Sequence, residues 1–169
     1  MRNSVFGCLL GAGLALSTSA AAQTILSDVS IYNAGAWDVA LITYDDGITA
    51  CLATVSNARA QFNLWALSDN TVFLAINSPG LGEMAKTTPL YVKIDRRSEW
   101  LLTDIVAEGD DVSTDLPDSA DSGYLIRELA VGRTLFITNN LGGVEETFSL
   151  SGSSRSIEVL SQCMKGIVR

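Results

Sequence analysis

The sequence predicts a mainly β fold: an antiparallel β-sandwich-like domain with two short helices, the C-terminal one joined to an early strand by a disulfide. Short apolar or alternating segments recur along the chain, separated by turns rich in Gly, Asn and Asp, which is typical of an all-β sandwich or barrel. Apolar residues at helical spacing occur in two segments near the C-terminus. One cysteine lies in an early apolar segment and another lies near the end.

The N-terminus has the pattern of a secretory signal peptide and is not expected to belong to the fold. A short start carrying Arg2 and an apolar segment that ends near residue 16 precede small residues with an A-x-A site at Ala22. The apolar segment is shorter than the roughly 20 residues that a membrane span needs. We therefore expect cleavage after Ala22, which leaves residues 23–169 as a single exported domain in the periplasm or outside the cell.

Most of the exported chain reads as short strands. Asp46 and Gly47 form a hairpin signal between the first two predicted strands. Pro79 and Gly80 indicate a loop over residues 78–82. The strands are predicted at residues 37–43, 49–55, 61–67, 71–76, 90–94, 99–105, 134–138 and 145–150.

An acidic segment interrupts this pattern. The stretch from Glu108 to Asp121, EGDDVSTDLPDSAD, has few apolar residues and is predicted to be a mobile loop or a short excursion. The following residues, 122–131, place apolar side chains at helical spacing and end at Gly132, a common stop signal. They predict the first of the two helices.

The second helix follows the last strand. Gly152 and Ser153 break the strand, and Ser154 is the predicted N-cap. Its apolar positions recur at a 3-4-3 spacing, which predicts one face packed on the core: Ile157, Leu160, Met164 and Ile167.

Two cysteines, Cys51 and Cys163, remain after removal of the leader, which contains Cys8. An even count in an exported chain favours a disulfide, and it would hold the last helix on the second predicted strand. The alternative is two free thiols or a redox pair, which the absence of a C-x-x-C motif disfavours.

Composition excludes several classes of partner. The chain has 11 basic and 19 acidic residues, and without Arg2 the count is 10 against 19, a net charge near −9. Such a protein is not expected to bind nucleic acid, whose phosphates require basic patches. Later apolar segments are interrupted by charges or glycines, so an integral membrane protein is not expected either.

No catalytic, cofactor-binding or metal-binding residue is assigned, and no cofactor is expected. The chain has no histidine, which removes Ser-His-Asp, Cys-His and His-ligated metal sites. Carboxylates in the acidic segment do not match the calcium-loop template, because Leu116 occupies the glycine position. The three tryptophans, Trp37, Trp65 and Trp100, lie in alternating strands, where a core or half-buried role outweighs a ligand platform.

The tail FSLSGSSRSIEVLSQC is similar to the strand–Gly–helix ending of the invasion-associated locus B proteins and related small periplasmic proteins of alphaproteobacteria. Trp37 at the start of the first predicted strand, Cys51 in the next and the segment PLYVKID also resemble that pattern. The Gly152-Ser153 junction departs from it, since an aromatic residue is expected after the glycine. The resemblance implies an exported β-sandwich with a terminal helix, and it transfers no catalytic residue.

These observations favour an exported, non-enzymatic envelope or interaction protein with a partner of unknown identity, expected in the cell envelope. Two alternatives stay open: a histidine-independent carboxylate hydrolase and a small-ligand carrier with an apolar cavity. Convergent carboxylates with perturbed ionisation would favour the hydrolase. An apolar patch or an exposed sheet edge would favour binding. The sequence does not predict the oligomeric state.

Overall fold

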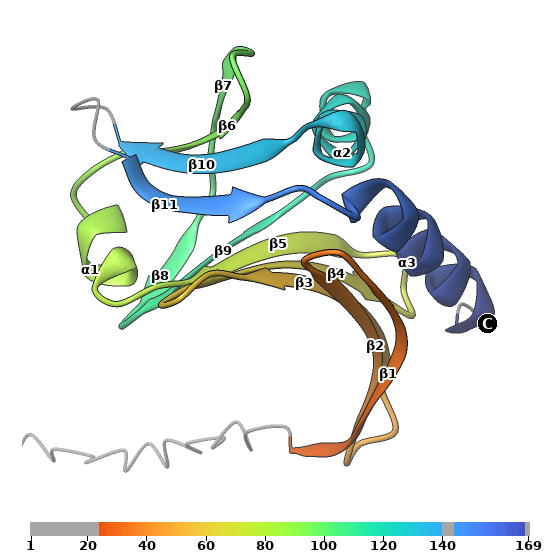
Figure 1. The fold of residues 1–169 in the computed structure, drawn as a ribbon. Helices are drawn as coiled ribbons and strands as arrows, with labels where there is room; N and C mark the ends of the chain where they lie inside the picture. Colours follow the sequence, from red (N-terminus) through yellow and green to blue (C-terminus); the bar gives the residue numbers. More distant parts are fainter. Residues whose placement is uncertain (1–23, 140–143, 168–169) are drawn as a thin grey trace, which may run out of the picture.

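The computed structural model describes residues 24–139 and 144–167, and in these residues the chain forms two antiparallel sheets and three helices (Figure 1). The larger sheet has the strand order β1-β2-β3-β4-β5-β9-β8. Its strands are β1 (Ile25–Ala34), β2 (Trp37–Tyr44), β3 (Thr49–Ser56), β4 (Gln61–Leu67), β5 (Val72–Asn77), β9 (Asp111–Asp115) and β8 (Val106–Glu108). This arrangement confirms the mainly β fold predicted from the sequence.

The smaller sheet packs over one face of the larger one. Its order is β11-β10-β6-β7, with β6 (Leu90–Ile94), β7 (Glu99–Leu101), β10 (Thr134–Asn139) and β11 (Val144–Ser149). The helices are α1 (Leu81–Ala85), α2 (Ala120–Val131) and α3 (Ser153–Ile167). Figure 1 shows α2 and α3 beside the small sheet, on the same side of the large sheet.

Large side chains from both sheets meet in the core. Trp37 of β2 and Phe62 of β4 make an edge-on contact with ring centroids 6.3 Å apart, and Phe62 lies 6.1 Å from Phe148 of β11. The Trp37 indole donates a hydrogen bond of 3.1 Å to the Ser149 carbonyl, so its polar atom is satisfied inside the core. This face of the large sheet is called the inner face below.

The predicted disulfide joins Cys51 of β3 to Cys163 of α3, with their Cα atoms 6.1 Å apart. Cys51 is fully buried, and the predicted apolar stripe of α3 packs against the same core cluster through Leu160, Met164 and Ile167. The C-terminal helix is therefore held to an early strand covalently as well as by packing, as the sequence predicted.

A close approach of two turns explains the glycine before α3. Gly152 has a φ of 96°, and a Cβ atom there would lie 2.1 Å from the Ala34 carbonyl oxygen. Ala36 donates a backbone hydrogen bond of 3.0 Å to the Ser151 carbonyl at the same contact. Only glycine fits both the backbone conformation and the space. The helix begins at Ser153, two residues earlier than an N-cap at Ser154 predicts, so Ser154 lies in its first turn.

The acidic segment was predicted as a loop, and this prediction is wrong for its first half. Residues of β9 pair with β5, and Val112 and Thr114 point into the core while the alternate residues face outward. A single apolar residue among five gives no visible alternation, so the strand depends on its pairing with β5 rather than on sequence pattern.

Three other differences concern short or edge elements. The predicted loop at residues 78–82 runs into the one-turn helix α1, and the strand predicted at residues 99–105 ends at Leu101. No strand was predicted over β1, which is the first edge of the large sheet.

Residues 1–22, predicted to be a signal peptide, lie outside the described residues. In the described part of the chain, none of the helices has both the length and the apolar character needed to span a membrane.

Candidate functional site

The most exposed apolar feature of the molecule is strand β1. Among the described residues it is paired with β2 on one side and with no strand on the other, along a strand of ten residues. Four of its apolar side chains are 44–67% exposed: Ile25, Leu26, Val29 and Ile31. A long edge strand with exposed apolar residues is a template for pairing with another chain.

Two irregularities shape this edge. The register between β1 and β2 shifts between Ile25 and Ser27 and again between Ser30 and Tyr32. Each bulge shifts the alternation of side chains by one position, so Leu26 and Ile31 fall outside the regular two-residue pattern. Figure 1 shows β1 and β2 curving together away from the small sheet, with α3 beside their upper part.

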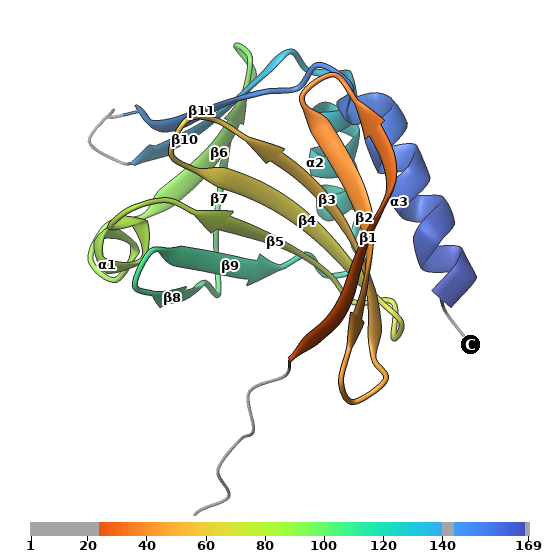
Figure 2. The same cartoon turned by 60° about the horizontal axis from the view of Figure 1, so that its bottom comes forward.

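The opposite edge of the same sheet is protected. Strand β8 is only three residues long, and α1 packs beside it and β9 (Figure 2). Gly82 of α1 lies so close to the backbone of Gly109 and Asp111 that a Cβ atom would clash at 2.7–2.8 Å. Short length and a covering helix are two of the ways in which proteins block an edge.

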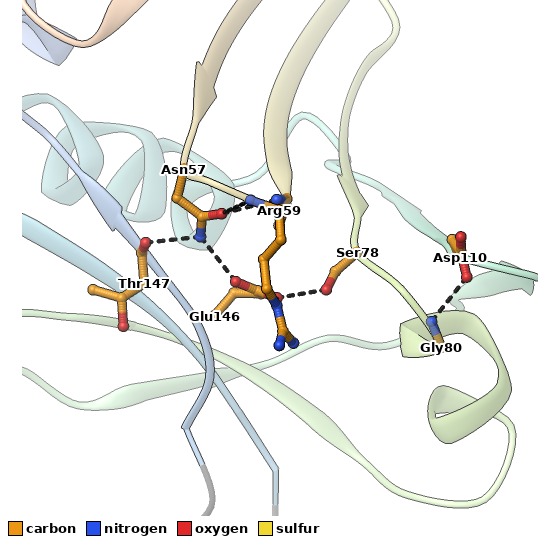
Figure 3. Close-up of polar contacts among 8 residues, drawn as sticks. Asn57, Arg59, Ser78, Gly80, Asp110, Glu146 and Thr147 are labelled. Atoms are coloured by element: carbon orange, nitrogen blue, oxygen red, sulfur yellow. Dashed lines mark hydrogen bonds and ion pairs between the residues drawn. The ribbon is translucent and has the colours of Figure 1, made fainter.

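The only buried carboxylate among the described residues is Glu146 of β11, which connects the two sheets (Figure 3). Its Oε1 accepts hydrogen bonds from Ser78 Oγ at 2.5 Å and from Arg59 Nε at 2.8 Å. Its Oε2 accepts one from Asn57 Nδ2 at 2.8 Å. Asn57 and Arg59 lie between β3 and β4, and Ser78 follows β5, so all three donors come from the large sheet.

These donors keep Glu146 ionised. Burial alone would raise its pKa, but the hydrogen bonds from Ser78, Asn57 and Arg59, together with the Arg59 charge, outweigh burial and lower the pKa below its usual value. A general acid requires a carboxyl whose pKa is raised towards neutrality. Glu146 is therefore suited to hold the sheets together as a fixed anion, and not to transfer protons.

The neighbouring carboxylate does not complete a catalytic pair. Glu145 alternates to the other side of β11 and accepts a hydrogen bond from Asn139. Within the described residues, no group of three or more Asp, Glu or Cys side chains could hold a metal ion together. The carboxylates of the acidic segment are distributed over β8, the turn before β9, β9 itself, the following loop and α2.

Two cavities border residues 116–122, between β5, β7, β9, α2 and α3. One has a volume of about 280 Å³ and is lined in part by Trp100, Thr114 and Leu125. The other, of about 450 Å³, lies against Val72, Ile126 and Met164. Both mix apolar walls with serine hydroxyls and aspartates, and the larger has the size of a small-molecule site.

The structure separates the three tryptophans. Trp37 is in the core, Trp65 stacks on Phe73 on the other face of the large sheet, and Trp100 belongs to the small sheet. Trp100 donates a hydrogen bond of 3.0 Å to Glu128 of α2. They form no common ligand platform, in agreement with the separate core and half-buried roles predicted for them.

Sequence reasoning missed both β1 and Glu146. The run ILSDVSIYNA carries β-branched residues and tyrosine, which are strand formers, but its two bulges break the alternation. In the segment VEETFSL, Glu146 alternates with Phe148 and Leu150, so all three side chains point towards the core. A carboxylate at a position expected to be buried was the signal in the sequence that could have identified Glu146.

Comparisons with protein-family models, with curated proteins and with solved structures found no match for this chain. The resemblance to the invasion-associated locus B proteins therefore remains a prediction.

Proposed function

We propose that this chain is an exported, non-enzymatic interaction protein that binds an extended segment of an envelope protein along β1. The observation that carries the proposal is the open edge of β1, with its ten residues and its four exposed apolar side chains. In strand addition, the backbone of the edge supplies hydrogen bonds, and the exposed side chains select the partner.

The edge lacks several of the features that usually prevent such pairing, although it contains two bulges and Asp28. β1 contains no lysine, arginine or proline. Helix α3 contacts it near the C-terminal end of the strand, where Arg155 lies over the Tyr32 ring, 6.0 Å from its centroid, so the part of the edge from Ile25 to Ile31 is the part offered for pairing. Its bulges and Asp28 restrict which partners fit, because an incoming strand has to follow the bent register. The contrast with the short, covered β8 edge supports a binding role for β1.

Export is part of the proposal and rests on two observations. The predicted leader ends at Ala22, and the Cys51–Cys163 disulfide is of a kind that persists in oxidising compartments. A hydrolase is less well supported, because Glu146, the one buried carboxylate in the part of the chain that the structure describes, is held ionised by three donors and so does not suit a general acid.

The test compares two double variants of the mature chain. Val29→Lys with Ile31→Lys places two cations on the open edge, where lysine blocks strand pairing. Val106→Lys with Val131→Lys makes the same chemical change at residues that are 68% and 62% exposed and lie away from β1. Each protein is used to capture partners by crosslinking in the native envelope.

We expect the wild type and the Val106/Val131 variant to retain the same partner and the Val29/Ile31 variant to lose it. Hydrogen exchange of the purified complex should then show protection of backbone amides in β1. Capture of that partner by the Val29/Ile31 variant, or protection elsewhere without any in β1, would contradict strand addition.

The larger cavity supports a second candidate, a small-ligand carrier. Its walls combine Val72, Ile126 and Met164 with the hydroxyls of Ser119 and Ser122. Native mass spectrometry of protein purified from its own envelope would show a bound molecule. Gly123→Leu, placed on the cavity wall of α2 where an added Cβ atom meets no atom within 4 Å, should abolish the added mass.

A further inference from the structure

The outer face of the large sheet, opposite to the core, carries a continuous apolar stripe. The strand registers place its side chains in two rows that cross β2, β3, β4 and β5. In the first row each residue is directly opposite the next: Ala40, Leu52, Trp65 and Phe73. The second row, one step along the strands, consists of Ile42, Ala50 and Leu67.

No helix of the described residues lies over this stripe. Figure 2 shows the outer face in front, with α2 behind the sheet and α3 at its side, next to β1 and β2. Trp65 and Phe73 are half-buried and stack with their planes 8° apart and their centroids separated by 5.8 Å. The stripe thus ends in a flat aromatic surface that solvent reaches.

The charges around the stripe have one sign. Across their described residues, none of the seven strands contains a lysine or an arginine. Asp28 of β1 is paired with Ile42 at one end of the second row, and Asp115 of β9 is paired with Phe73 at the end of the first row. Further carboxylates lie in the adjoining turns and in the next row: Asp38, Asp45, Asp46 and Asp69.

We propose that this outer face docks a cationic amphipathic helix of a partner protein. Ala40, Ile42 and Ala50 are at most 5% exposed and form the floor of the stripe. The apolar face of such a helix would cover the half-buried side chains above them, Leu52, Trp65, Leu67 and Phe73, and its lysines or arginines would meet Asp28 and Asp115. The inner face of the same strands already holds a helix, α3, which packs on β2, β3 and β4. A helix is therefore an occupant that this sheet geometry accepts.

The distance between the two flanking carboxylates sets the length of the occupant. From β1 to β9 the sheet crosses five strand spacings, about 24 Å at 4.8 Å each. A helix rises 1.5 Å per residue, so about 16 residues span the stripe. A second copy of this chain and an anionic lipid surface are both disfavoured, since each would bring negative charge against the same aspartates.

The experiment uses the mature, disulfide-bonded chain and two synthetic 18-residue helical peptides that share one leucine face. One peptide has lysines on its polar face, and the other has glutamates. We expect the lysine peptide to bind, with an affinity that falls as salt screens the charges, and the glutamate peptide not to bind. Binding should change the emission of Trp65, and Trp65→Phe should remove that change.

Two charge variants locate the binding surface. Asp28→Asn with Asp115→Asn removes the two flanking carboxylates, and we expect the dissociation constant for the lysine peptide to rise about fivefold, as two exposed ion pairs are lost. Asp104→Asn with Asp118→Asn makes the same change in net charge at exposed residues outside the large sheet. That control should bind within about twofold of the wild type.

Three results would overturn the proposal. Equal weakening by both variants would mean attraction to net charge alone. Equal binding of the two peptides would mean that the aspartates play no part. Absence of binding by the lysine peptide at low salt would mean that the stripe does not accept a helix. The proposal does not depend on strand pairing at β1, because neither peptide has to form a strand.

Discussion

The two faces of the large sheet contain similar amounts of apolar sequence but have opposite surroundings. On the inner face, Phe62, Leu64 and Leu74 are at most 1% exposed and pack against the small sheet and α3. On the outer face, Leu52, Trp65 and Phe73 remain half-buried, and no described element covers them. The strand alternation sends successive residues to these two faces.

This difference separates stability from binding within one sheet. The inner face holds the disulfide, the aromatic contacts and the Glu146 hydrogen bonds, so substitutions there should change the free energy of unfolding. The outer face carries the half-buried side chains Leu52, Trp65 and Phe73, and carboxylates in strands that contain no lysine or arginine. Substitutions of these exposed groups should change binding and affect folding less than substitutions on the inner face.

The largest effect is expected at the inner-face disulfide. Cys163→Ser should lower the free energy of unfolding by about 4 kcal/mol, because the bond closes a loop with a sequence separation of 112 residues. Chemical denaturation would measure this change. Hydrogen exchange should rise in α3 before it rises in β2 and β3, since a terminal helix opens first.

Wild-type protein treated with reductant is the matched control, and its free energy of unfolding should fall by a similar amount. An unchanged denaturation midpoint in both cases would show that packing alone holds α3. A rise of exchange in β2 before α3 would contradict the order of opening.

A matched pair of leucines tests the comparison directly. Leu64 of β4 points inward and is 1% exposed, and Leu52 of β3 points outward and is half-buried. Leu64→Ala should cost about 3 kcal/mol, because it leaves a cavity in the core. Leu52→Ala should cost about 1 kcal/mol, since water already reaches that side chain. Equal costs, measured by denaturation, would mean that the outer face is as much a core as the inner one.

The next effect concerns the connection between the sheets. Glu146→Gln replaces an ionised acceptor of three hydrogen bonds and should cost about 2 kcal/mol at pH 7. The cost stays moderate because the Arg59 side chain is 61% exposed and can be hydrated once its partner is neutral. Glu99→Gln, at an exposed ion pair with Lys93, is the control and should change little.

The same variant has a pH signature. The folded-state pKa of Glu146 is lowered, so its stabilisation is complete above the ordinary glutamate pKa of about 4.3. As the pH falls below that value, the unfolded chain takes up a proton before the folded one does, and this stabilisation is lost. The difference in stability between wild type and Glu146→Gln should therefore shrink below about pH 4.3. A constant difference down to lower pH would contradict the lowered pKa.

The inner face was largely predictable from the sequence. Buried strands such as β4 and β6 have clean alternation, and their predicted bounds match the structure. The helix stripe and the cysteine count predicted how the last element attaches. These signals work because burial imposes a period on the sequence.

The candidate sites were not predictable in the same way. β1 has no buried side to impose a period, and its bulges disturb the pattern that pairing would give. The outer stripe depends on which residues lie opposite one another across four strands, and only the register supplies that information. Strand β9 was missed for a similar reason, because it depends on pairing with β5 and not on a pattern in its own sequence.

The smallest effect on folding is expected at the flanking aspartates, and it sharpens the comparison most. Asp28 and Asp115 are exposed, and the charges in the seven described strands are all negative. Their replacement by asparagine removes some mutual repulsion and should change the free energy of unfolding by less than about 0.5 kcal/mol. The same variant should weaken the lysine peptide about fivefold, because the docked cations lose their counterions. Parallel denaturation and binding measurements on one preparation would give both numbers. If the variant lost stability in proportion to binding, the aspartates would support the fold. The assignment of stability to the inner face and of binding to the outer face would then be wrong.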